Sequence, residues 1–285
     1  MLVNMKEVLS KAEDGGYAVG AFNVPSLEMM RAVLEAAEEL KMPLILAHAE
    51  GHNEVIPLSL IGPILVNVAK NAKIPVVVHL DHCSDFELIK QAIDIGFTSV
   101  MIDASHMEYK DNVEITKKVV DYASKYNVSV EAELGVVATS EIGVDETKET
   151  ADASVENIYT DPDLAKKFVE ETGIDSLAAS FGTVHGIYLK EPKLDFDRLR
   201  NIHESAKIPI VMHGGSGLKD EDYINAIDNG VRKINYFSYL AKEGAEAVRE
   251  YLNSNKNVFY TDINVVGKEA MKEKAKKIIK IFSRK

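Results

Sequence analysis

The stretch VVVHLDHCSDFE, residues 76–87, joins an apolar run to two polar residues and then to the start of a second element. Three successive valines predict a buried strand, because β-branched side chains fit a pleated sheet that is covered on both faces. Ser84, followed by Phe86 and Glu87, is typical of a helix start. Asp81 and His82 therefore lie where a strand ends and a helix begins, which is where α/β proteins gather their ligand-binding residues.

The same order of elements recurs along the chain. Eight short apolar runs predict strands at residues 17–22, 43–48, 75–80, 98–103, 128–134, 176–181, 208–213 and 231–235. Apolar residues at helical spacing predict helices between them, for example at 27–41, 86–95, 113–126, 162–172 and 196–206. Strands that alternate with helices pair in parallel through right-handed crossovers. Eight such units in about 250 residues predict a (β/α)8 TIM barrel, whereas five or six would favour a doubly wound sheet.

The chain shows no linker or low-complexity tract, so we expect one domain over residues 1–285. The last segment, GKEAMKEKAKKIIKIFSRK, predicts an additional C-terminal helix at about 266–284. This helix is basic and amphipathic, which is compatible with a membrane surface. Packing on the barrel or on a partner subunit is the interpretation we favour.

Charge and cysteine content narrow the partners and the compartment. The formal net charge of −12 argues against nucleic acid or an anionic membrane as the main partner. The single cysteine, Cys83, cannot form an internal disulfide. The first residues are too charged for a signal peptide, and no run approaches the ~18 apolar residues that span a bilayer. These features predict a cytoplasmic protein.

Histidines and acids follow the predicted strands, at the end of a barrel where active sites form. His82, His185 and His213 each follow a strand and have small or glycine residues nearby. Three histidines with one open position are a catalytic zinc arrangement, and only the barrel would bring such distant residues together. His79 lies inside its strand and is expected to be packed or to support the site. His48 and His52 are weaker candidates for the substrate pocket.

The segment HGGSGL, residues 213–218, has the composition of a phosphate-binding loop. Its glycines leave backbone N–H groups accessible, and Ser216 adds a hydroxyl near the next helix start. Asn235 and Ser238 follow the last predicted strand. Since the loops after strands seven and eight commonly bind phosphate in such barrels, these two segments predict a phosphate site.

These motifs closely resemble those of the class II, zinc-dependent ketose-bisphosphate aldolases, the family of fructose- and tagatose-bisphosphate aldolases. The resemblance runs from GAFNVPSLEMMRAV (20–33) to GVRKIN (230–235), which is most of the chain. Five motifs occur in the family's order: HLDH (79–82), MIDASH (101–106), EAELG (131–135), GTVHGIY (182–188) and HGGSG (213–217).

The resemblance implies roles for individual residues. His82, His185 and His213 would bind one catalytic Zn²⁺. Asp81 would act as acid and base at the aldehyde oxygen, and Glu141 would transfer a proton from a flexible loop. Two further carboxylates would lie near the metal, Asp103 and Glu133. Substrate and its phosphate would be bound by Asn23, Gly186, Gly214, Ser216, Asn235 and Ser238. A monovalent cation, Na⁺ or K⁺, is also bound by many members.

The implied reaction is the reversible cleavage of a ketose 1,6-bisphosphate to dihydroxyacetone phosphate and glyceraldehyde 3-phosphate, by way of a zinc-stabilised enediolate. Fructose 1,6-bisphosphate is the substrate that we expect, and tagatose 1,6-bisphosphate or another phosphorylated keto-sugar is the alternative. The resemblance also implies a homodimer or homotetramer that binds small sugar phosphates.

Two segments depart from the family pattern. The loop VVATSEIGVDETKE (136–149) has Val, Ala and Thr where glycines are usual, so Asp145 or Glu146 is an alternative to Glu141. Tyr236 and Phe237 stand where small or acidic residues are usual, and their rings could narrow the pocket or point into packing.

Two other classes of function remain as alternatives. A zinc hydrolase on this barrel would commonly carry a His-x-His pair on the first strand, and AVGAFNV (18–24) has none. A sugar-phosphate-binding homologue without turnover is the second alternative, although all three predicted ligands and Asp81 are present.

Overall fold

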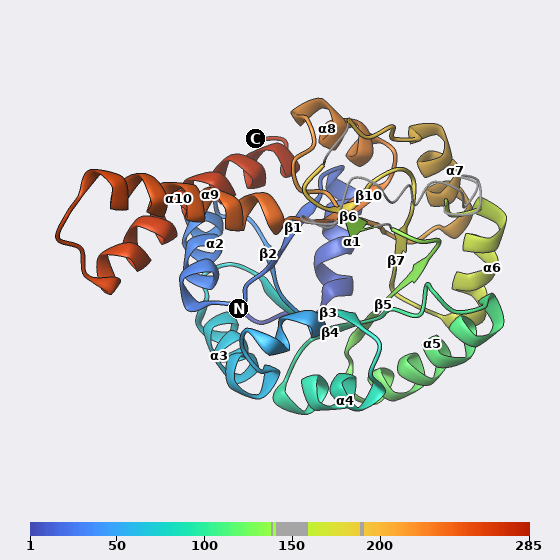
Figure 1. Ribbon diagram of the computed structural model, residues 1–285. Coiled ribbons are helices and arrows are strands. Elements are labelled where there is room, and N and C mark those ends of the chain that lie inside the picture. The colour runs from blue at the N-terminus through green and yellow to red at the C-terminus, as the bar shows by residue number, and fades with distance from the viewer. Residues whose placement is uncertain (138, 141–158, 189–190) are drawn as a thin grey trace, which may run out of the picture.

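The computed structural model describes residues 1–137, 139–140, 159–188 and 191–285. Within them, parallel strands close into a barrel in the order β1-β10-β9-β7-β5-β4-β3-β2 (Figure 1). These strands are β1 Val19–Asn23, β2 Leu44–Ala49, β3 Val76–Cys83, β4 Ser99–Ile102, β5 Ser129–Leu134, β7 Ser176–Ala179, β9 Ile210–Met212 and β10 Val231–Asn235. The predicted (β/α)8 barrel is confirmed, and each strand falls on one of the eight apolar runs.

Helices surround the barrel and separate its strands (Figure 1). They are α2 Leu27–Leu40, α3 Leu58–Asn71, α4 Phe86–Ile95, α5 Tyr109–Ala123, α6 Pro162–Thr172, α7 Phe196–Ala206, α8 Asp220–Asp228 and α9 Ser238–Ser254. Three predicted helices, at 86–95, 162–172 and 196–206, have the observed bounds. The helix predicted at 113–126 begins earlier, at Tyr109, and its last turn is a separate 3₁₀ helix, η2 Ser124–Tyr126. The remaining short elements are η1 Glu50–Glu54, β6 Thr139–Ser140 and β8 His185–Gly186.

Side-chain caps explain several helix starts. The Asp85 carboxylate accepts a hydrogen bond from Glu87 N at the start of α4, and Asp161 does the same for two N–H groups of α6. Such caps satisfy N–H groups that have no partner within the helix. Ser84, which the sequence suggested for the start of α4, instead donates its N–H and hydroxyl to Glu50 Oε2.

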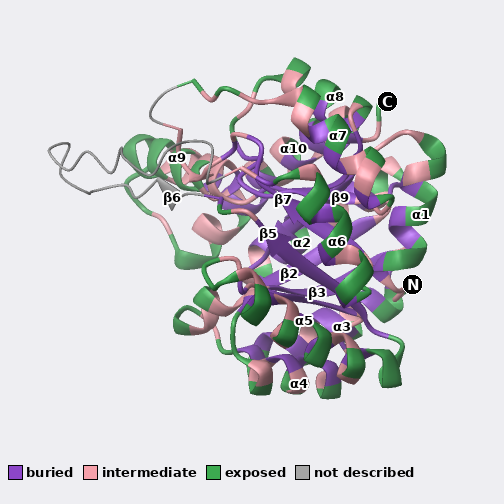
Figure 2. Cartoon of the chain, turned by 90° about the vertical axis from the view of Figure 1, so that its right-hand side faces the viewer, coloured by how far each residue is buried: buried purple, intermediate pink, exposed green. Residues whose placement is uncertain are grey.

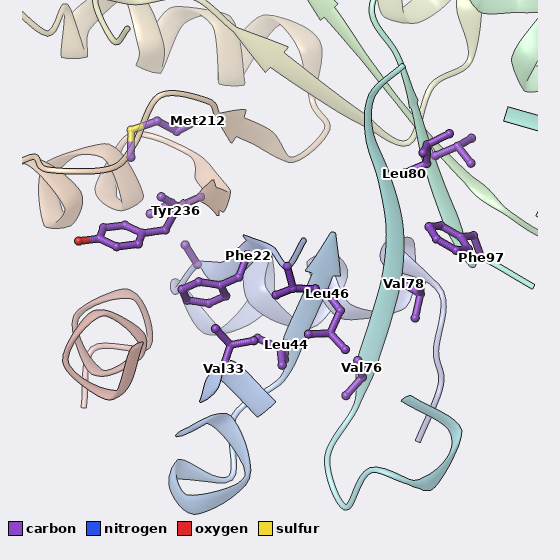
Figure 3. Packing of buried hydrophobic residues seen from close by; sticks show 14 of the residues in the cluster. Phe22, Val33, Leu44, Leu46, Val76, Val78, Leu80, Phe97, Met212 and Tyr236 are labelled. Carbon is purple, nitrogen blue, oxygen red and sulfur yellow. The ribbon is translucent and has the colours of Figure 1, made fainter. Parts of the chain in front are cut away.

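The main core lies between the barrel and the helices. Phe22, Leu46, Val78 and Tyr236 are among the side chains that meet there (Figure 3). In Figure 2 the strands are almost wholly buried, while the helices expose one face to solvent. The helices cover the outer face of the parallel sheet and side chains fill the barrel interior, so both faces of the sheet are buried.

One helix was not predicted. Helix α1, Met5–Gly15, precedes the first strand and packs Met5, Val8 and Leu9 against residues from three strands, Val19, Ala21, Ile45 and Val77. These strand residues lie near the amino ends of their strands. The helix therefore closes the end of the barrel opposite to the predicted site.

The C-terminal helix is longer than predicted. Helix α10 runs from Tyr260 to Phe282, so it begins before the expected residue 266. The Asp262 carboxylate accepts a hydrogen bond from Phe259 N at its first turn, and this start signal lies before the predicted range. The helix packs against α2 and α9, and the α9–α10 hairpin projects from the barrel on the left of Figure 1. In the described part of the chain, no helix is long and apolar enough to cross a membrane.

Candidate metal centre and active site

Three histidine side chains converge at the carboxyl end of the barrel. His82 lies near the end of β3, His185 begins the short strand β8, and His213 directly follows β9. Nε2 of His82 is 2.6 Å from Nδ1 of His213 and 3.1 Å from Nε2 of His185. The structure therefore brings together the three residues that the sequence named as zinc ligands.

Two carboxylates set the tautomers of two of these rings. Nδ1 of His82 lies 2.8 Å from Asp103 Oδ2, and Nε2 of His213 lies 2.8 Å from Glu131 Oε1. Ionised carboxylates only accept hydrogen bonds, so these two ring nitrogens carry the protons. When both rings are neutral, as metal ligands must be, the lone pairs of His82 Nε2 and His213 Nδ1 face each other, and a bound cation would satisfy both of them.

The electrostatics of the site also favour a cation. Burial opposes a charge on His82, but Asp81, Asp103 and Glu133 outweigh burial and raise the pKa of His82 to about 9. Burial and the nearby His82 lower the pKa of His185 to about 3, so this ring is neutral as a metal ligand must be. His82, His185 and His213 hence form a nitrogen donor set that fits Zn²⁺.

Asp81 lies beside this cluster and is fully buried. Asn23 Nδ2 donates to its Oδ2 at 2.8 Å, and Asn235 Nδ2 donates to both oxygens at 3.1 and 3.2 Å. Burial works against the charged form, but nearby His82, the hydrogen bond from His79 and the Lys233 ammonium hold the pKa of Asp81 well below its usual range. Asp81 is therefore an oriented, ionised base next to the three histidines.

A bulge explains how neighbouring residues serve one site. Successive side chains on a regular strand point to opposite faces, so Asp81 and His82 would normally diverge. The pairing of β3 with β4 shifts register between Leu80 and Cys83, and His82 has a positive φ of 43°. Bulges re-aim side chains next to active sites, and here the bulge turns His82 toward the other two histidines.

Glu133 and Asp103 also approach the cluster, as the sequence predicted. Each of them, with His82, offers a ligand atom within 4.8 Å of the others. Burial and the neighbouring Asp103 raise the pKa of Glu133 to about 8. Burial disfavours the charge of Asp103 too, but the hydrogen bond and charge of His82 lower its pKa below the ordinary value.

The glycine loop after β9 approaches two other segments at this end of the barrel. Gly214 has φ +62°, and a Cβ there would lie 2.4 Å from the Val184 carbonyl oxygen, so only glycine fits. Ser216 Oγ accepts a hydrogen bond from Phe237 N at 2.8 Å, which joins this loop to the end of β10. Gly186 lies in β8 with φ +95°, and Ser238 begins α9. The predicted phosphate-binding residues thus border one end of the barrel.

The bulky residues after β10 lie in two environments. Tyr236 is buried and packs against the rings of Phe22 and Phe282, so it belongs to the core. The Phe237 ring lies 4.8 Å from that of His52. His48 lies opposite Leu80 of the neighbouring strand, whose side chain packs in the core between barrel and helices, and its Nε2 is 3.1 Å from Asn53 Oδ1. The His48 ring therefore points away from the barrel interior, whereas the sequence had suggested a position in the substrate pocket.

Glu141, with the alternatives Asp145 and Glu146, lies outside the described residues. Sequence reasoning expected His79 to be packed or to support the site, but it missed the charged layer that His79 forms with Glu131 and Lys233 inside the barrel. The sequence does contain a signal for this layer. Each of its three residues lies two positions before a site residue on the same strand, so the two side chains point to the same face of the sheet.

A parallel (β/α)8 barrel with converging histidines and a buried carboxylate at the carboxyl ends of its strands is the architecture of metal-dependent barrel enzymes. The family model described as "Fructose-bisphosphate aldolase class-II" matches residues 3–285. The chain belongs to this family of lyases.

Named relatives agree with that assignment. Fructose-bisphosphate aldolases of Staphylococcus epidermidis and Staphylococcus aureus are 45% and 44% identical to the chain, over 99% of it and 97% of their own length. Among solved structures, the YdjI aldolase from Escherichia coli K12 is 34% identical with a TM-score of 0.87, covering 99% of this chain and 97% of that one. A putative fructose-1,6-biphosphate aldolase from Coccidioides immitis is 30% identical with a TM-score of 0.86, covering 98% and 96%.

Proposed function

We propose that this protein is a zinc-dependent aldolase that reversibly cleaves fructose 1,6-bisphosphate to dihydroxyacetone phosphate and glyceraldehyde 3-phosphate. The observation that carries the proposal is the convergence of His82, His185 and His213 beside the buried, ionised Asp81. The names of the Staphylococcus relatives support the choice of substrate.

The three histidines would hold the metal through Nε2 of His82, a ring nitrogen of His185 and Nδ1 of His213. Zinc bound there would act as a Lewis acid on the ketose carbonyl oxygen. Three protein ligands leave a further coordination position for substrate, as catalytic zinc sites require. Asp103 keeps the His82 ring in the tautomer that this role needs.

Asp81 would remove the proton from the C4 hydroxyl oxygen during cleavage and return it during condensation. The amide groups of Asn23 and Asn235 hold both of its oxygens in place. This orientation would keep the carboxylate directed at one atom of the substrate. A catalytic group that is held in position in this way lowers the activation barrier because less entropy is lost in the reaction. We assign the second proton transfer to Glu141; it would protonate the former C3 of the ketose, which becomes the hydroxymethyl carbon of dihydroxyacetone phosphate.

The phosphate of dihydroxyacetone phosphate would be bound by Gly186, Gly214, Ser216, Asn235 and Ser238. The support for this assignment is the close approach of the two glycine loops and the link from Ser216 to the backbone beside Ser238. The N-terminus of α9 adds N–H groups that favour an anion. A monovalent cation, Na⁺ or K⁺, near the same loops stays a prediction.

The test is a coupled assay of fructose 1,6-bisphosphate and tagatose 1,6-bisphosphate cleavage, before and after removal of metal by a chelator. We expect cleavage of fructose 1,6-bisphosphate to disappear on chelation and to return when Zn²⁺ is added. Turnover that is insensitive to chelation would contradict the mechanism. Faster cleavage of tagatose 1,6-bisphosphate would change the assigned substrate to that sugar. Variants at the Phe237–His52 contact would then test whether this contact determines the preference.

If a zinc-loaded protein cleaves neither sugar, the next assay is condensation of dihydroxyacetone phosphate with other aldehydes. Product formation would identify another phosphorylated keto-sugar as substrate. No product with any aldehyde would favour a sugar-phosphate-binding homologue without turnover.

We further propose a cytoplasmic homodimer or homotetramer built from a single catalytic domain. The packing of α10 on α2 and α9 supports one domain. Exposed Phe259 and Tyr260 at the tip of the α9–α10 hairpin support assembly, because exposed apolar patches mark interfaces.

A further inference from the structure

A lysine lies in the interior of the barrel beneath the three histidines. Lys233, on β10, has 0% of its surface exposed. Its ammonium donates to both oxygens of Glu131, at 2.9 and 2.8 Å, and lies 3.4 Å from His79 Nε2 and 3.8 Å from Asp81 Oδ1. Lys233 is therefore enclosed by polar side chains from three other positions on the barrel wall.

Stability alone gives no reason for this arrangement. Taking two charges out of water costs about as much free energy as their attraction returns, and apolar residues of the same volume commonly serve as well. The neighbouring interior layer of this barrel is apolar, with Met101, Ala178 and Val211. A buried ion pair directly below a site is consequently a candidate for a role in that site.

Glu131 connects Lys233 to a predicted metal ligand. Its Oε1 accepts the Nε2 proton of His213 at 2.8 Å while both of its oxygens accept from Lys233. Two hydrogen bonds from one ammonium fix the plane of the carboxylate, and the fixed carboxylate then fixes the rotation of the His213 ring. As a result Nδ1 of His213 points toward Nε2 of His82, 2.6 Å away.

We propose that the Lys233–Glu131 ion pair is a positioning device that holds His213 with its Nδ1 aimed at the metal between His82 and His185. This inference rests on the proposed zinc site. His79, whose Nδ1 bonds Ser99 Oγ at 2.8 Å, closes the other side of the lysine pocket. Neither Lys233 nor Glu131 is required to touch substrate, so both are positioning residues.

The experiment compares zinc affinity, by competition with a chromogenic chelator, in the parent protein and in the double variant Glu131→Leu with Lys233→Met. Removing both charges together avoids leaving one of them buried without a partner. We expect zinc affinity to fall about 10- to 100-fold, the usual effect of losing a group that supports a metal ligand. The visible absorption of the cobalt-substituted protein should also change, because the His213 ring is no longer held.

A second double variant and a control make the result specific. Glu131→Gln with Lys233→Met keeps a neutral acceptor for His213, so its zinc affinity should fall by a smaller factor. Lys268→Met is the matched control, since Lys268 is also a buried lysine that pairs with an acid, Glu35, but lies on α10. Its zinc affinity and cobalt spectrum should equal those of the parent.

The outcomes separate this inference from the proposed function. Unchanged zinc affinity in both double variants, with a parent-like cobalt spectrum, would overturn the positioning role while leaving the zinc site intact. Lost turnover with parent-like zinc affinity would also overturn it, because that result would indicate that Lys233 or Glu131 acts in catalysis itself. A parent protein that binds zinc no more tightly than its His185→Ala variant would instead refute the metal site. If Glu131→Leu with Lys233→Met does not fold, the glutamine variant carries the same comparison.

Discussion

Asp81 and His82 are consecutive in sequence and have different tasks in the proposed reaction. His82 is positioned by Asp103, and Asp81 is positioned by two asparagine side chains. The bulge in β3 allows both side chains to reach one site although they leave the strand from adjacent residues. Adjacency would keep the base close to the metal, so the Lewis acid could act on the carbonyl oxygen and the proton acceptor on the C4 hydroxyl of one substrate.

At this scale we predict the effect of Asp81→Asn. The variant has nearly the same shape but cannot accept a proton, so kcat should fall about 10²- to 10⁴-fold. Bound zinc should remain near one per chain, because Asp81 is not one of the predicted ligands. Steady-state kinetics and metal analysis of the same preparation measure both quantities.

A kcat within a few-fold of the parent would refute the role of Asp81 as base. Loss of zinc together with activity would show that its main role is to support the metal centre. His185→Ala is the reference variant for that comparison, because it removes a predicted ligand and should lose the metal.

Helix α1 illustrates how an element far from the site supports the barrel. Glu13, in its last turn, accepts a hydrogen bond from Arg232 of β10 at 3.0 Å and lies 3.2 Å from His203 Nε2 of α7. His203 of α7 is thus paired with an acid on a different helix. Three elements meet at this carboxylate, at the end of the barrel away from the histidines.

At this scale we predict that Glu13→Gln lowers the free energy of unfolding by roughly 1–2 kcal/mol, because largely buried Arg232 loses its anionic partner. The hydrogen bond with His203 is the main cause that lowers the pKa of Glu13. Burial raises this pKa, but the hydrogen bond and the charge of Arg232 together outweigh burial. A lowered folded pKa means that the stabilisation is complete above the unfolded value, about 4.3, and is lost as pH falls through the folded pKa. Urea unfolding of parent and variant at pH 7 and near pH 3 measures the difference.

The difference in stability between the two proteins should therefore be largest at neutral pH and should shrink in acid. A difference that grows as the pH falls would contradict the assignment. Glu7→Gln, on the same helix in a more exposed pair with Lys11, is the matched control and should change stability by less than about 0.5 kcal/mol.

The α9–α10 hairpin is the part of the molecule that departs most from a rounded barrel (Figure 1). Its tip exposes 77% of Phe259 and 76% of Tyr260, and Val265 is also exposed. The base of the hairpin is fastened to α2, for example by Lys268 and Lys272 with Glu35. A firmly attached arm with apolar residues at its end is suited to contact another subunit.

We predict that Phe259→Asp with Tyr260→Asp converts the oligomer to a smaller species, because two charges would have to be buried in the interface. Light scattering coupled to size-exclusion chromatography gives the mass. Tyr126→Asp is the control, since Tyr126 is 53% exposed at the end of a different helix and should leave the mass unchanged. A parent protein that is monomeric at micromolar concentration would contradict the interface.

Prediction from sequence succeeded where local pattern determines structure. The bounds of α4, α6 and α7 followed from apolar residues at helical spacing, and the strands followed from short β-branched runs. It was less accurate at Tyr260, where α10 begins, and at Met5–Gly15, because neither segment has the strand–helix alternation that identified the other elements. Those helices are held by packing on the barrel, which no local pattern records.

For the site, the sequence alone determined which residues were candidates: His82, His185, His213 and Asp81 stand after apolar runs, and alternation of strands and helices places the ends of those runs at one rim. Only the tertiary structure decided how they meet. The bulge that turns His82, the tautomer that Glu131 sets on His213, and the burial of Lys233 beneath them depend on contacts between strands far apart in the chain. The alternation of residues along a strand specifies the face of the sheet to which each side chain points. The orientation of a histidine ring depends instead on which side chains of other strands the closed barrel places opposite that ring.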